Sequence, residues 1–158
     1  MSTDFIGRVT AMRVGYFPLP TAEAAMSVIV STVTPDGFRH KIDINQQHEV
    51  FTDLPVDLGG ENSAPSPHDY FDAALASCKT LTVKLYAKQH DIPLTGVTVK
   101  VTHDDSEEKQ GKYRLNVELS LEGALSEQQR TVLHRIADRC PVHKLMTTAE
   151  ISINTQLV

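Results

Sequence analysis

The chain has 158 residues, of which 41% are hydrophobic and 22% charged, with 8 glycines and 8 prolines. This composition excludes disordered, collagen-like and coiled-coil proteins and suffices for one folded domain over residues 1–158. Acidic residues outnumber basic ones by 20 to 15, so neither nucleic acid nor an anionic membrane surface is an expected partner. Because no secretory signal and no long apolar run is visible, we expect a cytoplasmic protein.

The first third of the chain is predicted to form strands. Residues 8–14 and Met26–Val33 are rich in β-branched side chains between turn signals. Residues 34–37, Thr-Pro-Asp-Gly, predict a turn, because proline presets the backbone and glycine accepts a positive φ. The return strand, residues 38–45, alternates apolar and polar side chains, and His48–Thr52 adds another strand.

A loop rich in helix-breaking residues precedes the longest predicted helix. Residues 53–67 contain three prolines and two adjacent glycines. Ser66 is the expected N-cap, Pro67 the first helical residue and Asp69 the carboxylate of a capping box, with the helix running to about Gln89. At about 100° per residue, one face is apolar and Lys79 lies off it. That face comprises Phe71, Ala74, Leu75, Cys78, Leu81, Thr82 and Leu85.

The second half of the chain predicts a hairpin followed by helices. Alternating residues over 97–103 and 113–121 indicate paired strands joined by an acidic, solvated tip. A capping box at Ser126 opens a helix that ends at Cys140, because Pro141 disfavours helical geometry in the preceding residue. Pro141 then opens a short helix through Met146, and residues 151–157 alternate as a closing strand. The mixture of elements predicts the α+β class.

The two cysteines both fall on apolar helical positions, one in mid-helix and one at a helix junction. Thiols in the cytoplasm are kept reduced, so a structural disulfide is not expected. If Cys140 caps the helix opened by Pro141, the helix dipole favours its thiolate, and His143 and Lys144 add positive potential. Cys78, among apolar neighbours, is expected to be inert unless the fold delivers a cation from elsewhere.

Alternative interpretations of these residues stay open. Each cysteine alone could be a small buried hydrophobe, as free cysteine often is. Cys78, Cys140 and His143 could also bind zinc, but no complete ligand set with a recognised spacing is present, and we expect no metal and no other cofactor. His40 and His103 lie on apolar strand faces and are expected to be satisfied core histidines. No Gly-x-Ser-x-Gly motif favours a hydrolase.

Two stretches resemble the OsmC/Ohr family, the osmotically inducible and organic-hydroperoxide-resistance proteins. The first is DLGGENSAPSPHDYFDAALASCK, which ends just after Cys78, and the second is RIADRCPVHKLM, which contains Cys140. The resemblance extends over nearly the whole chain, with the elements in the same order. It implies an OsmC-like fold in which curved antiparallel sheets wrap central helices in an intertwined homodimer.

The resemblance also implies a chemistry for the two cysteines. Cys78 would attack an organic hydroperoxide or hydrogen peroxide and become a sulfenic acid, and Cys140 would condense with it to a disulfide. A small dithiol of the lipoyl type would then reduce the disulfide. The alternative is a stress-response or ligand-binding redox protein without efficient peroxidase turnover.

Four further residues are candidates for a supporting role. The peroxidase branch of the family carries, ten residues before its first cysteine, a glutamate that pairs with an activating arginine, and this chain has His68 there. Asp69 matches the broader branch, but lies on the helix side opposite Cys78 and is expected to act as a cap. Arg39 is the nearest candidate for the arginine, although the alternation of its strand predicts a solvated side chain. His143 is a candidate because it lies three residues after Cys140.

Overall fold

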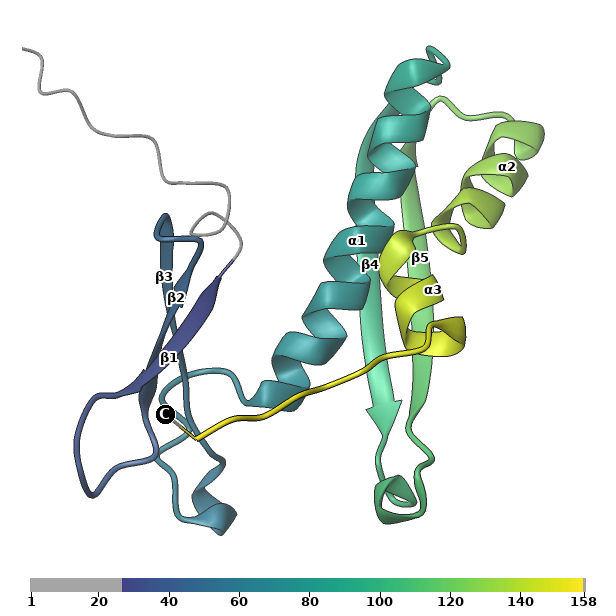
Figure 1. Cartoon of the computed structure of the whole chain (residues 1–158). Helices are drawn as coiled ribbons and strands as arrows, with labels where there is room; N and C mark the ends of the chain where they lie inside the picture. Colours follow the sequence, from purple (N-terminus) through teal and green to yellow (C-terminus); the bar gives the residue numbers. More distant parts are fainter. Residues whose placement is uncertain (1–26, 158) are drawn as a thin grey trace, which may run out of the picture.

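The computed structural model describes residues 27–157, so the predicted strand 8–14 and Met26 lie outside the described part of the chain. Five strands and three α-helices are present in that part (Figure 1). Their order is β1 (Val28–Thr32), β2 (His40–Ile44), β3 (His48–Thr52), α1 (Pro67–Gln89), β4 (Leu94–Asp104), β5 (Arg114–Gly123), α2 (Glu127–Ala137) and α3 (Pro141–Thr148), with 3₁₀ turns at Val56–Leu58 and Glu108–Gln110.

The first three strands form an antiparallel sheet with β2 in the middle. The predicted turn between β1 and β2 is present, and the N–H of Gly37 donates to the carbonyl of Thr34 over 3.3 Å. Thr32 pairs with His40 across the first pair of strands, and His40 pairs with Thr52 across the second. The predicted strand His48–Thr52 is therefore confirmed, whereas the predicted strand 38–45 is shorter at both ends.

Helix α1 begins where its capping residues require. The Ser66 hydroxyl accepts the N–H of Asp69 over 3.2 Å, and the Asp69 carboxylate accepts the N–H of Ser66 over 2.7 Å. These two bonds satisfy backbone donors that the first turn of a helix leaves free. The hydrogen bonds from the side chain and backbone of Ser66 lower the pKa of Asp69. The predicted helix start and the predicted capping role of Asp69 are confirmed.

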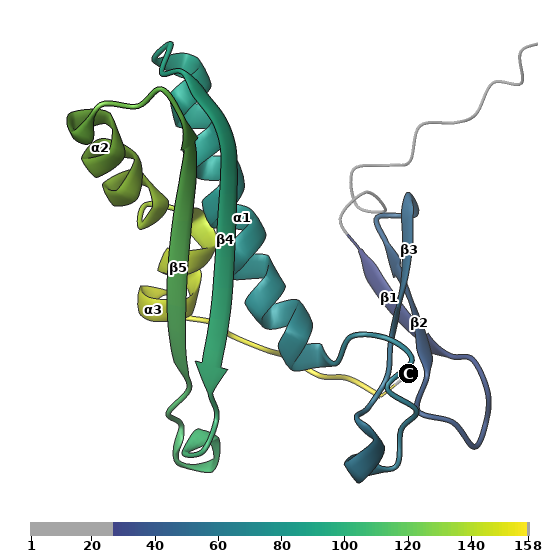
Figure 2. The ribbon, with the colours of Figure 1, turned by 180° about the vertical axis from the view of Figure 1, so that it is seen from behind.

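All three helices lie on one face of the β4–β5 hairpin, as the two opposite views show (Figures 1 and 2). The core lies between α1, α2 and this hairpin. Its buried members are Val83, Ala87, Leu133 and Ala137, with Leu119 and Leu121 of β5 packed against them. Burial of a leucine or valine side chain contributes about 1.5–3 kcal/mol, so this small cluster anchors α2 on α1.

The predicted apolar face of α1 is buried only at Leu75, and the rest of the buried face lies to one side of it. The buried residues of α1 are Leu75, Lys79, Val83 and Ala87. Leu81 and Leu85, predicted to be in the core, are 66% and 57% exposed. Helix α1 carries two neighbouring stripes, and β4, α2 and α3 cover only the one that includes Lys79.

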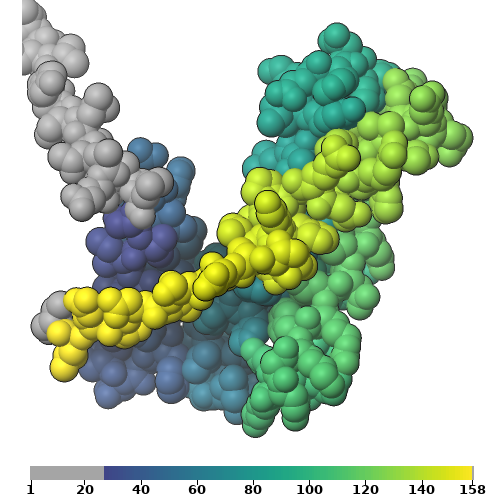
Figure 3. All heavy atoms as spheres, turned by 45° about the vertical axis from the view of Figure 1, so that its right-hand side comes forward, coloured from purple at the N-terminus to yellow at the C-terminus, as the bar shows by residue number. Residues whose placement is uncertain are grey.

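The predicted closing strand is wrong. Residues 149–157 have no regular secondary structure and are exposed. They extend from α3 across the surface towards the first sheet (Figure 3). A strand forms only beside another strand that satisfies its backbone groups, and among residues 27–157 this segment has no such neighbour.

None of the helices in residues 27–157 combines the length and the apolar character that crossing a membrane requires.

The capping box predicts a measurable contribution to stability. Ser66→Ala removes the acceptor of the Asp69 N–H and is expected to lower the free energy of unfolding by about 1 kcal/mol, measured by urea denaturation. Ser77→Ala removes the same hydroxyl from an exposed position of the same helix and is the matched control. An equal unfolding midpoint for both variants would contradict the prediction.

Candidate functional site

The two cysteines come together from distant parts of the chain. Cys78 lies in the middle of α1, and Cys140 lies at the corner between α2 and α3. Their side chains are close enough to interact, and both are free thiols in this structure. Cys78 is partly exposed, at the edge of the uncovered stripe of α1, whereas Cys140 has no exposed surface. A solvent-borne reactant can therefore reach Cys78 more readily than Cys140.

Cys140 is the N-cap of α3, as predicted. Its Sγ accepts the N–H of His143 over 3.2 Å. Burial nevertheless raises the pKa of the Cys140 thiol, and the neighbouring Cys78 thiol raises it further, against the opposing effects of the His143 N–H and Lys79. The expectation that the helix N-terminus leaves Cys140 with a favoured thiolate is thus wrong, because desolvation outweighs the hydrogen bond from the His143 N–H.

A buried lysine adjoins both cysteines, next to Cys78 in sequence and facing the Cys140 corner. Lys79 is 2% exposed. Its Nζ lies 3.0 Å from the carbonyl oxygen of Ala137, 3.0 Å from Oδ1 of Asp138 and 3.3 Å from Nδ1 of His143. The hydrogen bond from Lys79 holds the pKa of Asp138 below its ordinary value. The sequence pattern predicts Lys79 to lie off the buried face and gives no sign of a role for Asp138.

One sequence signal could have identified this lysine. Lys79 stands four residues after Leu75 and four before Val83, which is the spacing of one helical stripe. Its charge outweighed that spacing in the prediction, because lysine is almost never fully buried unless it is paired.

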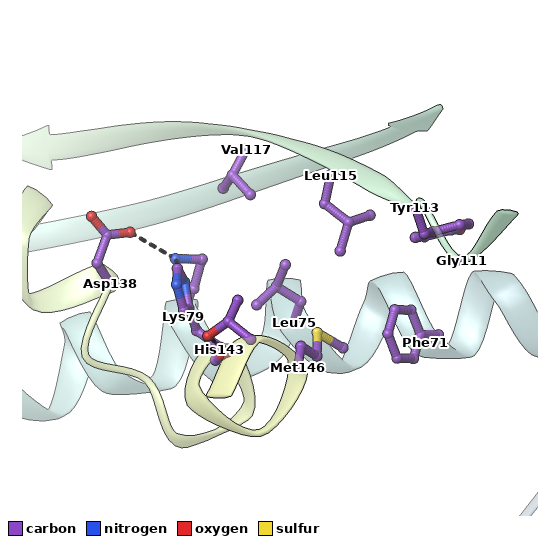
Figure 4. Close-up of a pocket in the computed structure, with 11 residues that line it drawn as sticks. Phe71, Leu75, Lys79, Gly111, Tyr113, Leu115, Val117, Asp138, His143 and Met146 are labelled. Carbon is purple, nitrogen blue, oxygen red and sulfur yellow. Dashed lines mark hydrogen bonds and ion pairs between the residues drawn. The ribbon is translucent and has the colours of Figure 1, made fainter. Parts of the chain in front are cut away.

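An apolar cavity of about 520 Å³ ends at this lysine (Figure 4). It lies between α1, β5 and α3. Its apolar lining consists of Phe71, Leu75, Tyr113, Leu115, Val117 and Met146, and its polar end consists of Lys79, Asp138 and His143. The walls suit an apolar molecule of modest size, and the polar end lies at the corner that holds Cys140.

A second polar group connects the start of α1 with the hairpin. The Asp72 carboxylate lies 2.5 Å from Nδ1 of His103 and accepts the hydroxyl of Tyr113 over 3.3 Å. The hydrogen bond to Asp72 raises the pKa of His103, and burial together with Asp72 raises the pKa of Tyr113 to about 12. The prediction that His103 is a core histidine is therefore wrong. Its side chain is 33% exposed and forms an ion pair with Asp72.

Arg39 is not the solvated side chain that the strand alternation predicted. Its Nη1 donates to the carbonyl and hydroxyl oxygens of Ser63, and its guanidinium lies 4.2 Å from the centre of the Phe51 ring. Ser63 in turn donates its N–H and hydroxyl to the buried carboxylate of Asp53, and these bonds lower the pKa of Asp53 to about 2. The contacts of Arg39 thus order the loop before α1 and involve neither thiol.

The other candidates occupy different places. His68 Nε2 lies 2.8 Å from a Glu108 carboxylate oxygen at the tip of the hairpin, away from the helix junction. Asp69 caps α1. His143 is the one supporting candidate that contacts the site directly, through its N–H to Cys140 and its ring to Lys79.

Within residues 27–157, no group of three histidine, cysteine, aspartate or glutamate side chains is arranged to hold a metal ion. The zinc hypothesis also meets a chemical difficulty at His143, because Nδ1 of this ring faces an ammonium group that can only donate hydrogen bonds.

Helix α1 packs on the β4–β5 hairpin, and the two thiols lie where α1 meets the α2–α3 corner. These features define a small α+β protein with a paired-cysteine site. Residues 60–156 match the family of OsmC-like proteins, and the chain belongs to that family. The predicted family and the predicted α+β fold are confirmed.

Solved structures show the same fold. A Psychrobacter arcticus protein assigned to osmotic stress induction and detoxification response is 24% identical, with a TM-score of 0.65 over 84% of this chain and 93% of its own. The OsmC-like protein of Mycoplasma pneumoniae is 20% identical, with a TM-score of 0.62 over 84% and 96%. An organic hydroperoxide resistance protein of Legionella pneumophila is 23% identical, with a TM-score of 0.55 over 77% and 90%. No curated protein sequence matches the chain.

The Asp72–His103 pair predicts a pH dependence. Because the folded pKa of His103 is raised, the pair stabilises the fold fully below the unfolded pKa of about 6.5, and this stabilisation is lost as the pH rises through the higher folded value. Asp72→Asn is expected to lower the pKa of His103, measured by NMR titration of its ring. Asp91→Asn, just beyond the C-terminal end of α1, is the control and should leave the titration of His103 unchanged. An unchanged titration in Asp72→Asn would contradict the prediction.

Proposed function

We propose that this protein is a thiol-dependent peroxide reductase that acts on organic hydroperoxides. The observation that carries the proposal is the proximity of a partly exposed Cys78 and a fully buried Cys140, whose side chains are close enough to interact. Reaction with peroxide needs one accessible thiol, and rescue of that thiol from further oxidation needs a second thiol beside it. The role of Cys78 as attacking residue and of Cys140 as resolving residue follows from their difference in exposure.

The proposed cycle has three chemical stages. The Cys78 thiolate attacks one peroxide oxygen, the S–O bond forms as the O–O bond breaks, and the leaving alkoxide takes a proton to become an alcohol. The sulfur of Cys140 then attacks the Cys78 sulfenic acid, the S–S bond forms, and hydroxide leaves as water with the thiol proton. A dithiol finally reduces the disulfide by two exchange steps and becomes a disulfide itself.

The cavity supports an organic substrate. Its apolar walls, from Phe71 to Met146, match an alkyl or acyl chain, and its polar end adjoins the Cys140 corner. Hydrogen peroxide would leave this apolar surface unused. The proposed reductant is a lipoyl-type dithiol. The proposed location is the cytoplasm, because thiols are kept reduced there and the cycle needs both cysteines in the reduced state.

We also propose that the 158-residue chain forms one OsmC-like unit of a homodimer. In the single chain, Leu81 and Leu85 of α1 and the apolar residues of β1 are exposed. Exposed apolar stripes of this kind mark a protein interface. A second copy that covers α1 and continues the sheets around it accounts for the apolar face predicted from the sequence.

The two cysteine roles are tested by single replacements. Cys78→Ser is expected to reduce consumption of cumene hydroperoxide, with dihydrolipoamide as reductant, to the rate measured without protein. Cys140→Ser is expected to complete the first reduction of peroxide and then to accumulate the sulfenic and sulfinic acids of Cys78, detected by mass spectrometry. Ser77→Ala is the matched control and should keep full turnover.

Two outcomes would count against the peroxidase. Full activity of Cys78→Ser would exclude the proposed attacking residue. Oxidation of the wild-type thiols in a single turnover, with no cycling by dihydrolipoamide or other dithiols, would favour a stress-response redox protein instead. The placement of Arg39 on Ser63 and Phe51 gives that second function its support, because this guanidinium does not activate Cys78 in the single chain.

The homodimer is tested on the uncovered stripe. Leu81→Asp places a charge in the proposed interface and is expected to convert the dimer into a monomer of 17.4 kDa, measured by sedimentation velocity. Lys109→Asp, at an exposed position of the hairpin tip, is the control and should leave the dimer intact. A wild-type monomer at micromolar concentration would contradict the proposal.

A further inference from the structure

Lys79 is the most deeply buried charged side chain of the site. It extends from α1 into a pocket whose apolar walls include Val99, Val117 and Leu119 of the hairpin. An isolated ammonium is costly to bury, and the cost is offset only when each of its hydrogens finds an acceptor. Here the three acceptors are the carbonyl of Ala137, the carboxylate of Asp138 and the ring of His143.

These acceptors belong to the helical corner that carries Cys140. Ala137 is the last residue of α2, Asp138 is its C-cap, and His143 lies in the first turn of α3. Since an ammonium only donates, Nδ1 of His143 accepts, and the ring proton is on Nε2. The N–H of His143 meanwhile donates to Cys140 Sγ. One side chain of α1 thus holds the residues on both sides of the buried thiol.

We propose that Lys79 is a positioning residue for the resolving thiol, seating the α2–α3 corner on α1 so that Cys140 meets Cys78 and supplying the positive charge of that corner. This inference rests on the proposed function, in which Cys140 attacks the Cys78 sulfenic acid. It assigns the cation beside Cys140 to α1 itself and not to an arginine from elsewhere in the chain.

The charged and titratable groups around Cys140 make the effect of this charge testable. Helix α1 contributes Cys78 and Lys79, α2 contributes His134 and, at its end, Asp138, and α3 contributes His143. The hairpin adds only apolar residues to the lysine pocket. Burial raises the pKa of Cys140, and Lys79 opposes that rise. Without Lys79, less thiolate would be present to close the disulfide, and Cys78 would stay longer as a sulfenic acid.

The first experiment measures the protonation of Cys140 without any peroxide. The thiolate absorbance of Cys140 is measured against pH in three proteins that all carry Cys78→Ser. One keeps Lys79, one carries Lys79→Met and one carries Lys79→Arg. Lys79→Met is expected to lower the thiolate fraction at neutral pH about tenfold, the effect of removing one nearby unit charge. Lys79→Arg keeps the charge and should keep most of the thiolate. Equal titrations for all three proteins would overturn the proposal.

Asp138→Asn separates the electrostatic effect of Lys79 on Cys140 from its structural role in holding the α2–α3 corner. It removes the negative partner of Lys79, so a charge effect predicts more thiolate at Cys140, opposite in sign to Lys79→Met. A purely structural ion pair predicts changes in the same direction for both variants, and that result would overturn the proposal. If Lys79→Met does not fold, as judged by circular dichroism, the Asp138→Asn and Lys79→Arg titrations still decide it.

The second experiment separates this inference from the proposed function. With both cysteines present, stopped-flow measurements give the rate of Cys78 oxidation by cumene hydroperoxide and the rate of disulfide closure. Lys79→Met is expected to slow closure about tenfold and to increase sulfinic acid at Cys78. Failure of wild-type Cys78 to react would reject the proposed function, whereas normal reaction with unchanged closure in Lys79→Met would reject only the role of Lys79.

Discussion

The burial of one ammonium group, that of Lys79, constrains the arrangement of the site. A lysine that is 2% exposed cannot leave its hydrogens without acceptors, because a buried unpaired charge costs several kcal/mol. The carbonyl that ends α2, the carboxylate of Asp138 and the ring of His143 must therefore stay around it. The α2–α3 corner is fixed on α1 by this requirement, and Cys140 is fixed with it.

The same arrangement gives the two thiols different environments although their side chains are close enough to interact. Cys78 lies at the boundary between the covered and uncovered stripes of α1, and Cys140 lies behind it in the interior. The N-terminus of α3 and the lysine both favour a thiolate at Cys140, yet burial is the larger effect and the pKa of that thiol is raised. The apolar cavity reaches the corner from the side of the hairpin and ends at Lys79, Asp138 and His143, and neither cysteine is among the residues that line it.

Local signals in the sequence predicted local structure well. The capping boxes at Ser66 and Ser126, and the proline after Cys140, placed the starts of the three helices correctly, because these signals act within one turn. The predicted end of α2 at Cys140 is wrong, since that helix ends at Ala137. The prediction of the buried face of α1 was wrong. Neighbouring elements cover the stripe with Lys79 and leave the stripe with Leu81 exposed, and the sequence of the helix alone does not show this. Tertiary pairing decides such cases, as it does for Arg39, whose partner Ser63 lies 24 residues away.

The complete burial of Cys140 also sets the direction of the reductive half of the proposed cycle. A dithiol arriving from solvent meets only the Cys78 sulfur of the disulfide, so the mixed disulfide forms there and Cys140 departs as the leaving group. A leaving thiolate expelled into an apolar interior needs a nearby positive charge, and the ammonium of Lys79 stands in that place. Lys79 would therefore stabilise the Cys140 thiolate twice, when that thiolate attacks Cys78 during oxidation and when it leaves during reduction.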